Sequence, residues 1–283
     1  SPTQAPRQIN QRLRRDNVVT VDYAGSGALD VTPSLLATTS VGVQMAREDL
    51  GTSTLGGRGF PAPAVETVSG TAVPFTATQT ELVNTTVGFF AQETFGWNDR
   101  LFVTGGLRVD NNSAFGEDFK WVTYPKADVS WVISEEPFWP IPEVVDALRL
   151  RAAYGESGRA PDAFSALRTF EPVQGPGGSN AVTPGSLGNP NLRPERGKEI
   201  EFGFEASLFE RLTLDFTYFD KTTEDLIIDQ DVAPSSGFAG SRPINVGVVD
   251  NSGFEVSATF DALRRTNIAW QIGATYATND DVI

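Results

Sequence analysis

Residues 199 to 218 alternate apolar and polar side chains with a period of two. One face of the first half carries Ile200, Phe202, Phe204, Ala206 and Leu208, and the other carries Glu199, Glu201, Gly203 and Glu205. A short connection, Phe209-Glu210-Arg211, leads to a second run in which Leu212, Leu214, Phe216 and Tyr218 oppose Thr213, Asp215 and Thr217. Because side chains alternate across a strand, this pattern predicts an antiparallel hairpin with one apolar and one charged face.

The length of these two strands favours a membrane over a soluble sheet. Strands of globular proteins are mostly about 5–6 residues long, whereas about 9–11 tilted residues cross a bilayer. The alternation here continues for about ten residues, which matches the second figure. A soluble sandwich sheet with one wet face is the alternative that the same alternation allows.

The same alternation recurs along the chain and predicts an all-β meander of about ten strands. We place them at residues 17–31, 35–46, 82–95, 100–111, 121–134, 148–155, 199–208, 212–218, 252–263 and 267–277. Since proline cannot donate to a ladder, we expect a bulge or irregular pairing at Pro125. One short helical turn is expected near residues 142–147.

The predicted connections alternate in length. Those after odd strands are short or medium, and those after even strands are longer, with the longest at residues 48–81, 156–196 and 229–250. Outer-membrane barrels have short periplasmic turns and long outer loops, so we expect the long loops to face outside. Four aromatic residues then gather near the periplasmic interface as a belt would: Trp97, Trp131, Phe138 and Trp139.

Composition excludes several classes of function. The net charge of −14 argues against nucleic acid as a partner, because nucleic-acid binding needs a basic surface. The chain has no histidine and no cysteine, which removes the commonest metal ligands and most nucleophile-and-base arrangements. No run of about 18 apolar residues predicts a transmembrane helix.

The acidic residues of the opening hairpin have two interpretations. Paired carboxylates can hydrolyse glycosides, but Glu199, Glu201 and Glu205 repeat along one face of a strand. Arg149 and Arg151 are expected to point the same way from the preceding strand, so a cross-strand charge ladder is favoured. Acidic groups around residues 220–231 and 110–118 fit no calcium-loop spacing and are expected to be solvated rims. We therefore predict no catalytic, cofactor-binding or metal-binding residue.

Four segments of the chain resemble a known family. NPNLRPERGKEIEFGFE, at residues 189–205, and the following LTLDFTYFDKTTEDLI are similar to the late barrel of TonB-dependent outer-membrane receptors. DRLFVTGGLRVDNNSAFGEDF and LRLRAAYGESGRAP resemble the SusC/RagA-like branch. The resemblance implies a transmembrane β-barrel in the bacterial outer membrane that imports glycans, peptides or other large nutrients.

The resemblance also implies partners and a larger barrel. The expected partners are outer-membrane lipid, the TonB complex acting through a plug, a surface lipoprotein of the SusD type, and a small-molecule, glycan or peptide ligand. Such receptors close with about 22 strands around a plug, so we expect residues 1–283 to be a partial barrel domain that lacks the plug and the remaining strands. On its own it should not transport, and its open edges should require detergent.

The outer loops are the remaining candidates for ligand contact, because loops on a rigid scaffold commonly carry function. In the loop over residues 156–196 we single out six residues: Arg159, Asp162, Phe164, Arg168, Phe170 and Asn180. The expected function is that of a receptor and transporter, not an enzyme. The alternative is a secreted or surface all-β binding protein without transport activity.

Overall fold

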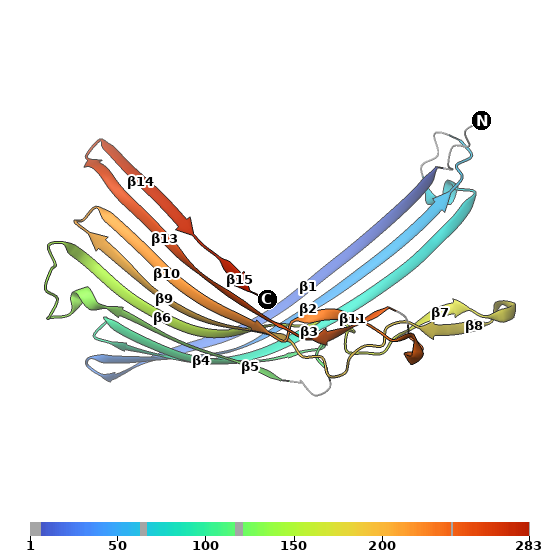
Figure 1. The fold of residues 1–283 in the computed structure, drawn as a ribbon, viewed down its shortest axis with the longest axis horizontal. Helices are drawn as coiled ribbons and strands as arrows, with labels where there is room; N and C mark the ends of the chain where they lie inside the picture. Colours follow the sequence, from blue (N-terminus) through green and yellow to red (C-terminus); the bar gives the residue numbers. More distant parts are fainter. Residues whose placement is uncertain (1–6, 63–66, 117–120, 239, 283) are drawn as a thin grey trace. The chain divides into compact units, whose positions relative to one another are not determined.

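The computed structural model describes residues 7–62, 67–116, 121–238 and 240–282. Ten long antiparallel strands form one meander (Figure 1). In pairing order they are β1 (Gln8–Thr32), β2 (Leu35–Arg58), β3 (Val73–Trp97), β4 (Leu101–Asn112), β5 (Val122–Val132), β6 (Val145–Arg159), β9 (Glu195–Leu208), β10 (Leu212–Glu224), β13 (Val248–Arg265) and β14 (Ile268–Ala277). The all-β meander of about ten strands is confirmed.

Shorter elements lie between and beyond these strands. β7 (Phe170–Gln174) pairs with β8 (Asn180–Pro184), β11 (Ile227–Asp231) pairs with β12 (Ser241–Asn245), and β15 (Asp280–Val282) pairs with β13. Four single 3-10 turns are η1 (Val68–Gly70), η2 (Ile133–Glu135), η3 (Pro176–Gly178) and η4 (Pro234–Ser236). In the part of the chain that the structure describes, no helix has the length and apolar character needed to span a membrane.

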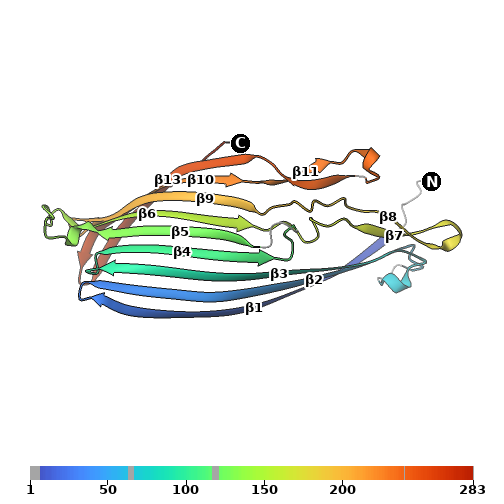
Figure 2. The ribbon, with the colours of Figure 1, turned by 90° about the horizontal axis from the view of Figure 1, so that it is seen from below.

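The chain divides into two compact units, and the long first strands pass through both. Unit 1 comprises Ser1–Val21 with Gln44–Val87, and unit 2 comprises Asp22–Val43 with Gly88–Ile283. Within unit 2, strands β4, β5, β6 and β9 lie side by side, and the β7–β8 hairpin extends beyond their ends (Figure 2).

The register of unit 2 places apolar residues opposite one another from strand to strand. One row of partners crosses six strands: Val103, Val129, Ala152, Phe202, Tyr218 and Phe254. The next row toward the tight turns is Leu101, Trp131, Leu150, Phe204, Phe216, Val256 and Tyr276. Rings of neighbouring strands stack within this row and between the two rows: the centroids of Phe204 and Phe216 are 5.6 Å apart, and those of Phe216 and Phe254, in the first row, are 6.2 Å apart. The predicted apolar face is confirmed as one continuous surface.

The tight turns at one end of unit 2 use residues in the left-handed region. Asn98 and Asp99 have φ of 50° and 54°, and Phe209 and Glu210 have φ of 56° and 54°. Two successive left-handed residues match the twist of a two-residue hairpin. Asn and Asp tolerate this region, whereas Phe and Glu seldom adopt it. The second turn is held from outside: Phe209 N donates to Val144 O at 3.1 Å, and Glu210 N donates to Asp146 Oδ2 at 2.5 Å.

The belt residues lie at this same end of unit 2. Trp131 pairs with Leu101 directly after the Asn98–Asp99 turn, and its ring meets Phe138 at 6.3 Å. Trp139 Nε1 donates to Val145 O at 3.3 Å. Trp97 is 56% exposed and Phe138 is 62% exposed, as expected of residues that would meet an interface. The belt itself stays a prediction.

Aromatic residues on the polar face lie over glycines of a neighbouring strand. A Cβ added at Gly253 would come within 2.8 Å of Phe219 Cζ, and one added at Gly96 would come within 3.1 Å of Phe102 Cε1. A ring can therefore lie flat on bare backbone instead of projecting from the sheet. These glycines are required for close approach rather than for a special backbone angle.

Three predictions about local structure have different outcomes. The prediction of a loop over residues 48–81 is wrong, because β2 continues to Arg58 and β3 begins at Val73. These extensions of the two strands are rich in Gly, Ser and Thr and lack the apolar alternation of a membrane span. The irregularity at Pro125 is wrong for the β4 side, where Leu107 pairs with Pro125 in unbroken register. On the other side, the pairing of β5 with β6 begins only at Lys126, so Pro125, which has no N–H, lies outside that ladder. The helical turn is confirmed at its start, since Val145 N donates to Ile141 O at 3.0 Å, but residues 145–147 already belong to β6.

Candidate functional site

The polar face of unit 2 carries a network of charges across three strands. Arg149 donates to Glu205, its register partner. Arg151 Nη1 lies 2.6 Å from Glu205 Oε1, and its Nη2 lies 2.8 Å from Asp215 Oδ1 and 2.5 Å from Thr217 Oγ1. The predicted contact of the two arginines with an acid of β9 is confirmed at Glu205, whereas Glu199 lies 3.8 Å from Lys221 and no ion pair among the described residues involves Glu201. Glu205 and Asp215 each hold a guanidinium, which is a structural arrangement and not a free acid–base pair.

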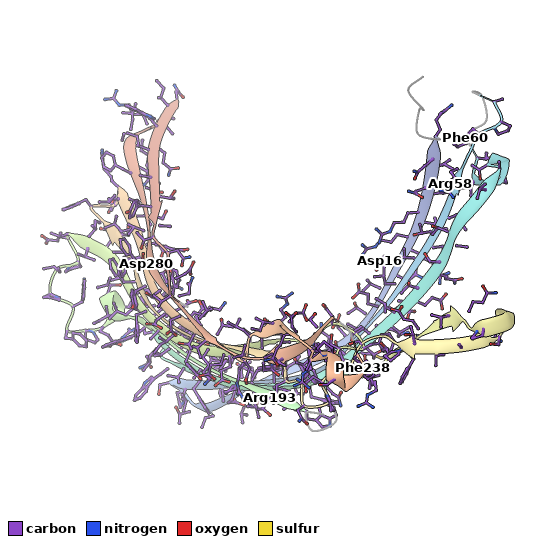
Figure 3. The ribbon with its side chains drawn as sticks, turned by 45° about the vertical axis from the view of Figure 1, so that its right-hand side comes forward. Asp16, Arg58, Phe60, Arg193, Phe238 and Asp280 are labelled. Atoms are coloured by element: carbon purple, nitrogen blue, oxygen red, sulfur yellow. The ribbon has the colours of Figure 1, made fainter. Side chains whose placement is uncertain are left out.

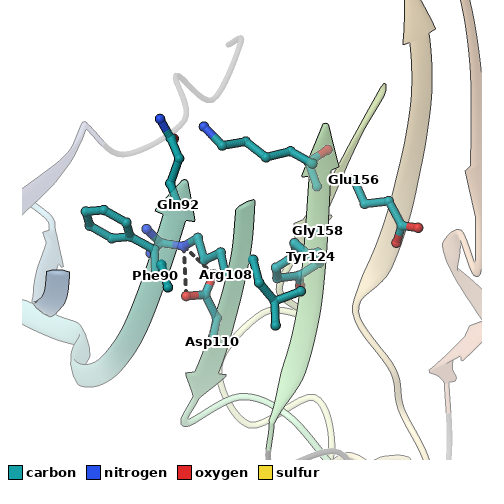
Figure 4. Close-up of a pocket in the computed structure, with 11 residues that line it drawn as sticks. Phe90, Gln92, Arg108, Asp110, Tyr124, Glu156 and Gly158 are labelled. Carbon is teal, nitrogen blue, oxygen red and sulfur yellow. Dashed lines mark hydrogen bonds and ion pairs between the residues drawn. The ribbon is translucent and has the colours of Figure 1, made fainter. Parts of the chain in front are cut away.

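A cavity of about 460 Å³ opens nearer the outer ends of β3, β4, β5 and β6 (Figure 4). Arg108 Nε lies 2.9 Å from Asp110 Oδ1 at one side, and Glu156 accepts from Arg196 at the other. Tyr124, only 8% exposed, lies against Gly158, where any Cβ would collide with its hydroxyl. Its ring therefore closes the space where β5 and β6 separate beyond Lys126. The cavity combines aromatic walls with two paired carboxylates, and Lys126 also lines it without an ion pair among the described residues.

The apolar face ends in charged residues at the outer side. On β9 it runs from Leu208 to Ile200, a length close to the roughly 9–11 residues that cross a bilayer. Immediately beyond, Lys198 Nζ lies 2.7 Å from Glu224 Oε2, and Thr222 Oγ1 donates to Asp250 Oδ1 at 2.7 Å. On β9 and β10 the strand residues beyond this boundary are all polar or glycine. The boundary therefore marks where the apolar surface of these strands ends.

Two outer loops, residues 160–194 and 225–247, are joined by asparagine side chains. Asn245 Oδ1 accepts from Arg193 N at 2.8 Å, and its Nδ2 donates to Arg193 O at 2.9 Å and to Asp225 O at 2.8 Å. Asn189 Nδ2 donates to Pro243 O at 3.0 Å. Leu192, between these residues, is fully buried. The NPNLRP segment is thus a structural bridge, and Figure 3 marks Arg193 within it.

The bridge continues on both sides of the loops. Ile227 N donates to Glu195 Oε1 at 3.0 Å, and Gly116 N of the β4–β5 connection donates to Leu192 O at 3.3 Å. Three outer connections therefore meet at one short segment. We refer to residues 187–195 with Asn245 as the loop bridge.

The six predicted ligand-facing residues do not form one cluster. Arg168 and Phe170 come together over Phe238, at 5.4 Å and 6.1 Å from its ring centroid. Phe238 is only 8% exposed and lies near the base of the β7–β8 hairpin (Figure 3). Phe170 itself is 55% exposed, so the cluster presents one aromatic and one cationic group to the outside.

The other four predicted residues lie apart from that cluster. Arg159 pairs with Glu195 across β6 and β9, with Nη1 3.9 Å from Oε2. Asp162 and Phe164 form local turns, and Phe164 has φ of 66°. Asn180 begins β8 opposite Gln174. Sequence reasoning missed Phe238 and Asn245, because the loop that carries them has no local signal for a partner far away in the chain.

Two members of the first acidic group, Glu224 and Asp225, have cationic partners. Arg193 Nη1 lies 3.5 Å from Asp225 Oδ2, and Glu224 holds Lys198. Asn112 is buried, and its Oδ1 accepts from Ala114 N at 2.7 Å. Glu117 and Asp118 of the predicted second rim lie outside the described residues. Among the residues that are described, no three His, Cys, Asp or Glu are grouped so that they could hold a metal ion.

Comparison with known proteins identifies the family. A family model described as TonB dependent receptor-like, beta-barrel, matches residues 2–283. The chain belongs to this family. It is therefore an outer-membrane β-barrel segment, in agreement with the resemblance of its motifs.

Relatives and solved structures agree with this assignment. TonB-dependent receptor P26 of Formosa agariphila is 32% identical over 69% of this chain, which corresponds to 20% of that protein. TonB-dependent receptor SusC of Bacteroides thetaiotaomicron is 26% identical over 71% of the chain and 21% of that protein. A structure of the RagAB peptide transporter superposes with a TM-score of 0.86 at 18% identity, covering 97% of this chain and 31% of that one.

These coverages limit which properties of the relatives can be assigned to this chain. The chain spans about a fifth of the length of the curated relatives it matches. The likeness to the transporter structure shows the fold alone. The alternative of a secreted all-β binding protein does not agree with membership of an outer-membrane family. The family is one of receptors rather than enzymes.

Proposed function

We propose that the chain is the part of a TonB-dependent importer that supplies a wall of its barrel and part of its ligand-contact surface. The imported molecule would be a glycan, a peptide or a nutrient of similar size. Energy would come from the TonB complex through a plug domain. The observation that carries the proposal is the division of one sheet into an apolar outer face, a charged inner face and bridged outer loops, within a receptor family.

The cluster of Arg168, Phe170 and Phe238 is the proposed ligand contact. Phe170 offers an exposed ring that can stack on a sugar or an aromatic side chain, and Arg168 offers a guanidinium for a carboxylate or carbonyl. The loop bridge holds both loops that contribute to it. A surface lipoprotein of the SusD type is the proposed protein partner at this outer side, supported by the likeness to RagAB and SusC.

Uptake by the full-length receptor in cells tests the proposal. Fluorescently labelled peptides and oligosaccharides of graded length would be supplied to cells with and without a working TonB. We expect uptake of one class, and its loss without TonB. Uptake that continues at the same rate without TonB would contradict active import.

The ligand contact is tested separately with the double substitution Arg168→Ala and Phe170→Ala. Loss of two contacts of the hot-spot kind, each costing on the order of 1–2 kcal/mol, should weaken binding at least about tenfold. Glu171→Ala is the matched control, since Glu171 is also exposed but points to the other side of β7. Equal affinity of the double variant and the wild type would remove these residues from the site.

A further inference from the structure

The apolar face of β3 carries an ionisable residue among apolar ones. Phe89, Ala91, Phe95 and Trp97 share this face, and Glu93 alternates onto it between Ala91 and Phe95. Phe89 and Phe95 are 50% and 45% exposed. Four residues of a tilted strand separate Glu93 from Trp97, a rise of about 10 Å, and the apolar band of an outer-membrane barrel is about 25 Å tall. Glu93 therefore lies near the middle of the apolar surface.

Glu93 has a hydrogen-bond donor on one side and a glycine on the other. Thr39 Oγ1 of β2 donates to Glu93 Oε2 at 2.6 Å. Thr94 Oγ1 lies 3.2 Å from Thr104 Oγ1 across β3 and β4. One step along these antiparallel strands, Glu93 and Gly105 therefore lie opposite each other on the apolar face. A Cβ added at Gly105 would meet no atom within 4 Å. The carboxyl group thus borders open space.

The open space continues as a shallow hollow across the apolar face of β4, β5, β6 and β9. The hollow measures about 300 Å³, and small residues in it, Ala127 and Ala152, lie between Val103 and Phe202. Gly105 pairs with Ala127, so the hollow is two strands, or about 10 Å, from the backbone of β3. Small-ligand sites measure about 300–1,000 Å³. An apolar hollow at the lower end of this range, with a carboxyl group beside it, suits a small amphiphile.

The surroundings of Glu93 do not depend on strands beyond the edges of the sheet. β3 has β2 on one side and β4 on the other (Figure 2), and the site lies within unit 2. A strand added beside β1 or β14 would extend the sheet without covering this face. Within the described part of the chain, Glu93 takes part in no ion pair. Ionisable groups at this depth are costly and usually pair with another group, so we expect a cationic partner from the membrane.

We propose that Glu93 and the hollow bind a lipophilic primary amine with a single alkyl chain. Its ammonium group would donate to Glu93 Oε1 while Thr39 donates to Oε2, and the chain would lie over Gly105 and Ala127. Charge selects this class, because hydrogen bonds between charged groups are stronger than those to neutral hydroxyls. A phospholipid does not fit, since its phosphate would place a second anion beside Glu93.

Quenching by spin-labelled amphiphiles tests this site in the full-length receptor. The receptor, with a fluorophore on a single cysteine in place of Val41, would be placed in phosphatidylcholine vesicles at neutral pH. Val41 is 52% exposed and is the next residue after Thr39 on the same face of β2. A primary amine, an alcohol and a fatty acid of equal chain length would be compared as quenchers.

We expect the amine to reach half-maximal quenching at a mole fraction at least about tenfold lower than the alcohol or the fatty acid. Equal quenching by all three would overturn the proposal. Glu93→Gln should remove the preference, because it keeps the size of the side chain and an oxygen for Thr39 but removes the charge. Removing a charge from an apolar surface should not impair folding.

Glu201→Gln is the matched control, since Glu201 lies on the polar face of the wall. It should leave the preference for the amine unchanged. The proposal fails if Glu93→Gln binds the amine like the wild type, or if Glu201→Gln loses the preference to the same extent.

A charge swap separates the site from general attraction of a cation to an acidic protein. Gln92→Glu combined with Glu93→Gln keeps the net charge of β3 but moves the carboxyl group to the polar face, because adjacent residues of a strand face opposite sides. We expect the swap to lose the preference for the amine. A preference equal to that of the wild type would show that overall charge attracts the amine, and would refute the site.

Discussion

The β9–β10 hairpin and the outer loops that flank it are built in different ways. In the hairpin, every residue from Leu212 to Glu224 has a partner in β9, and the apolar and polar faces follow from alternation alone. In the loops, the arrangement depends on a few side chains, above all Asn189 and Asn245, which bond backbone groups about 50 residues away. The local alternation of side chains therefore determines the wall of the barrel, and long-range hydrogen bonds determine how its outer loops are arranged.

The largest expected effect comes from placing a charge on the apolar face of the hairpin. Phe204 lies midway between Leu208 and Ile200, opposite Phe216. Phe204→Arg should lower the free energy of unfolding of the full-length receptor in lipid vesicles by about 2–4 kcal/mol, because it puts a guanidinium near the bilayer midplane. Urea unfolding would measure the loss.

Ser257→Arg is the matched control for this substitution. Ser257 pairs with Asp215 on the polar face, so an arginine there remains beside a carboxylate. We expect a change below about 1 kcal/mol. Comparable destabilisation by both substitutions would show that the two faces are not distinguished by their surroundings.

A smaller effect is expected within the charge network of the polar face. Arg151→Ala removes the cationic partner of Asp215 and one of the two partners of Glu205, and should destabilise by about 1–3 kcal/mol, since hydrogen bonds to charged groups are lost. Arg149→Ala removes one bond of a more exposed guanidinium and should cost less than about 1 kcal/mol. A double-mutant cycle of Arg151→Ala with Asp215→Asn would measure their coupling. An Arg149→Ala effect larger than that of Arg151→Ala would reverse the assignment.

The effect expected at the loop bridge is local. Asn245→Ala removes three hydrogen bonds and should speed hydrogen exchange at the amide of Arg193, while overall stability changes little. Asn191→Ala is the control, because Asn191 is exposed and its backbone N–H, which the substitution retains, donates to Asn189. Unchanged exchange at Arg193 in Asn245→Ala would show that the loops are held by other contacts.

These differences explain what the sequence could predict. The ten strands, the facing of Phe202 and Glu201, and the pairing of Arg151 with an acid of β9 all follow from a period of two and from strand order. The extensions of β2 and β3 beyond the membrane were missed because they are paired without apolar alternation. The β7–β8 hairpin was missed for a related reason, since its strands are short and exposed on both faces. Phe238 was missed because only the folded loops bring it beside Arg168.

Labelling of single cysteines along β9 tests the central assignment most directly, and the chain has no cysteine of its own. Spin labels at positions 195 to 207 of the full-length receptor in lipid vesicles would be compared for access by oxygen, which concentrates in lipid, and by a water-soluble nickel complex. We predict oxygen access at 200, 202, 204 and 206, nickel access at 199, 201, 203 and 205, and a change to nickel access on both faces beyond Lys198. Access without a period of two, or oxygen access at Glu201 and Glu205, would contradict a barrel wall with lipid on one face only.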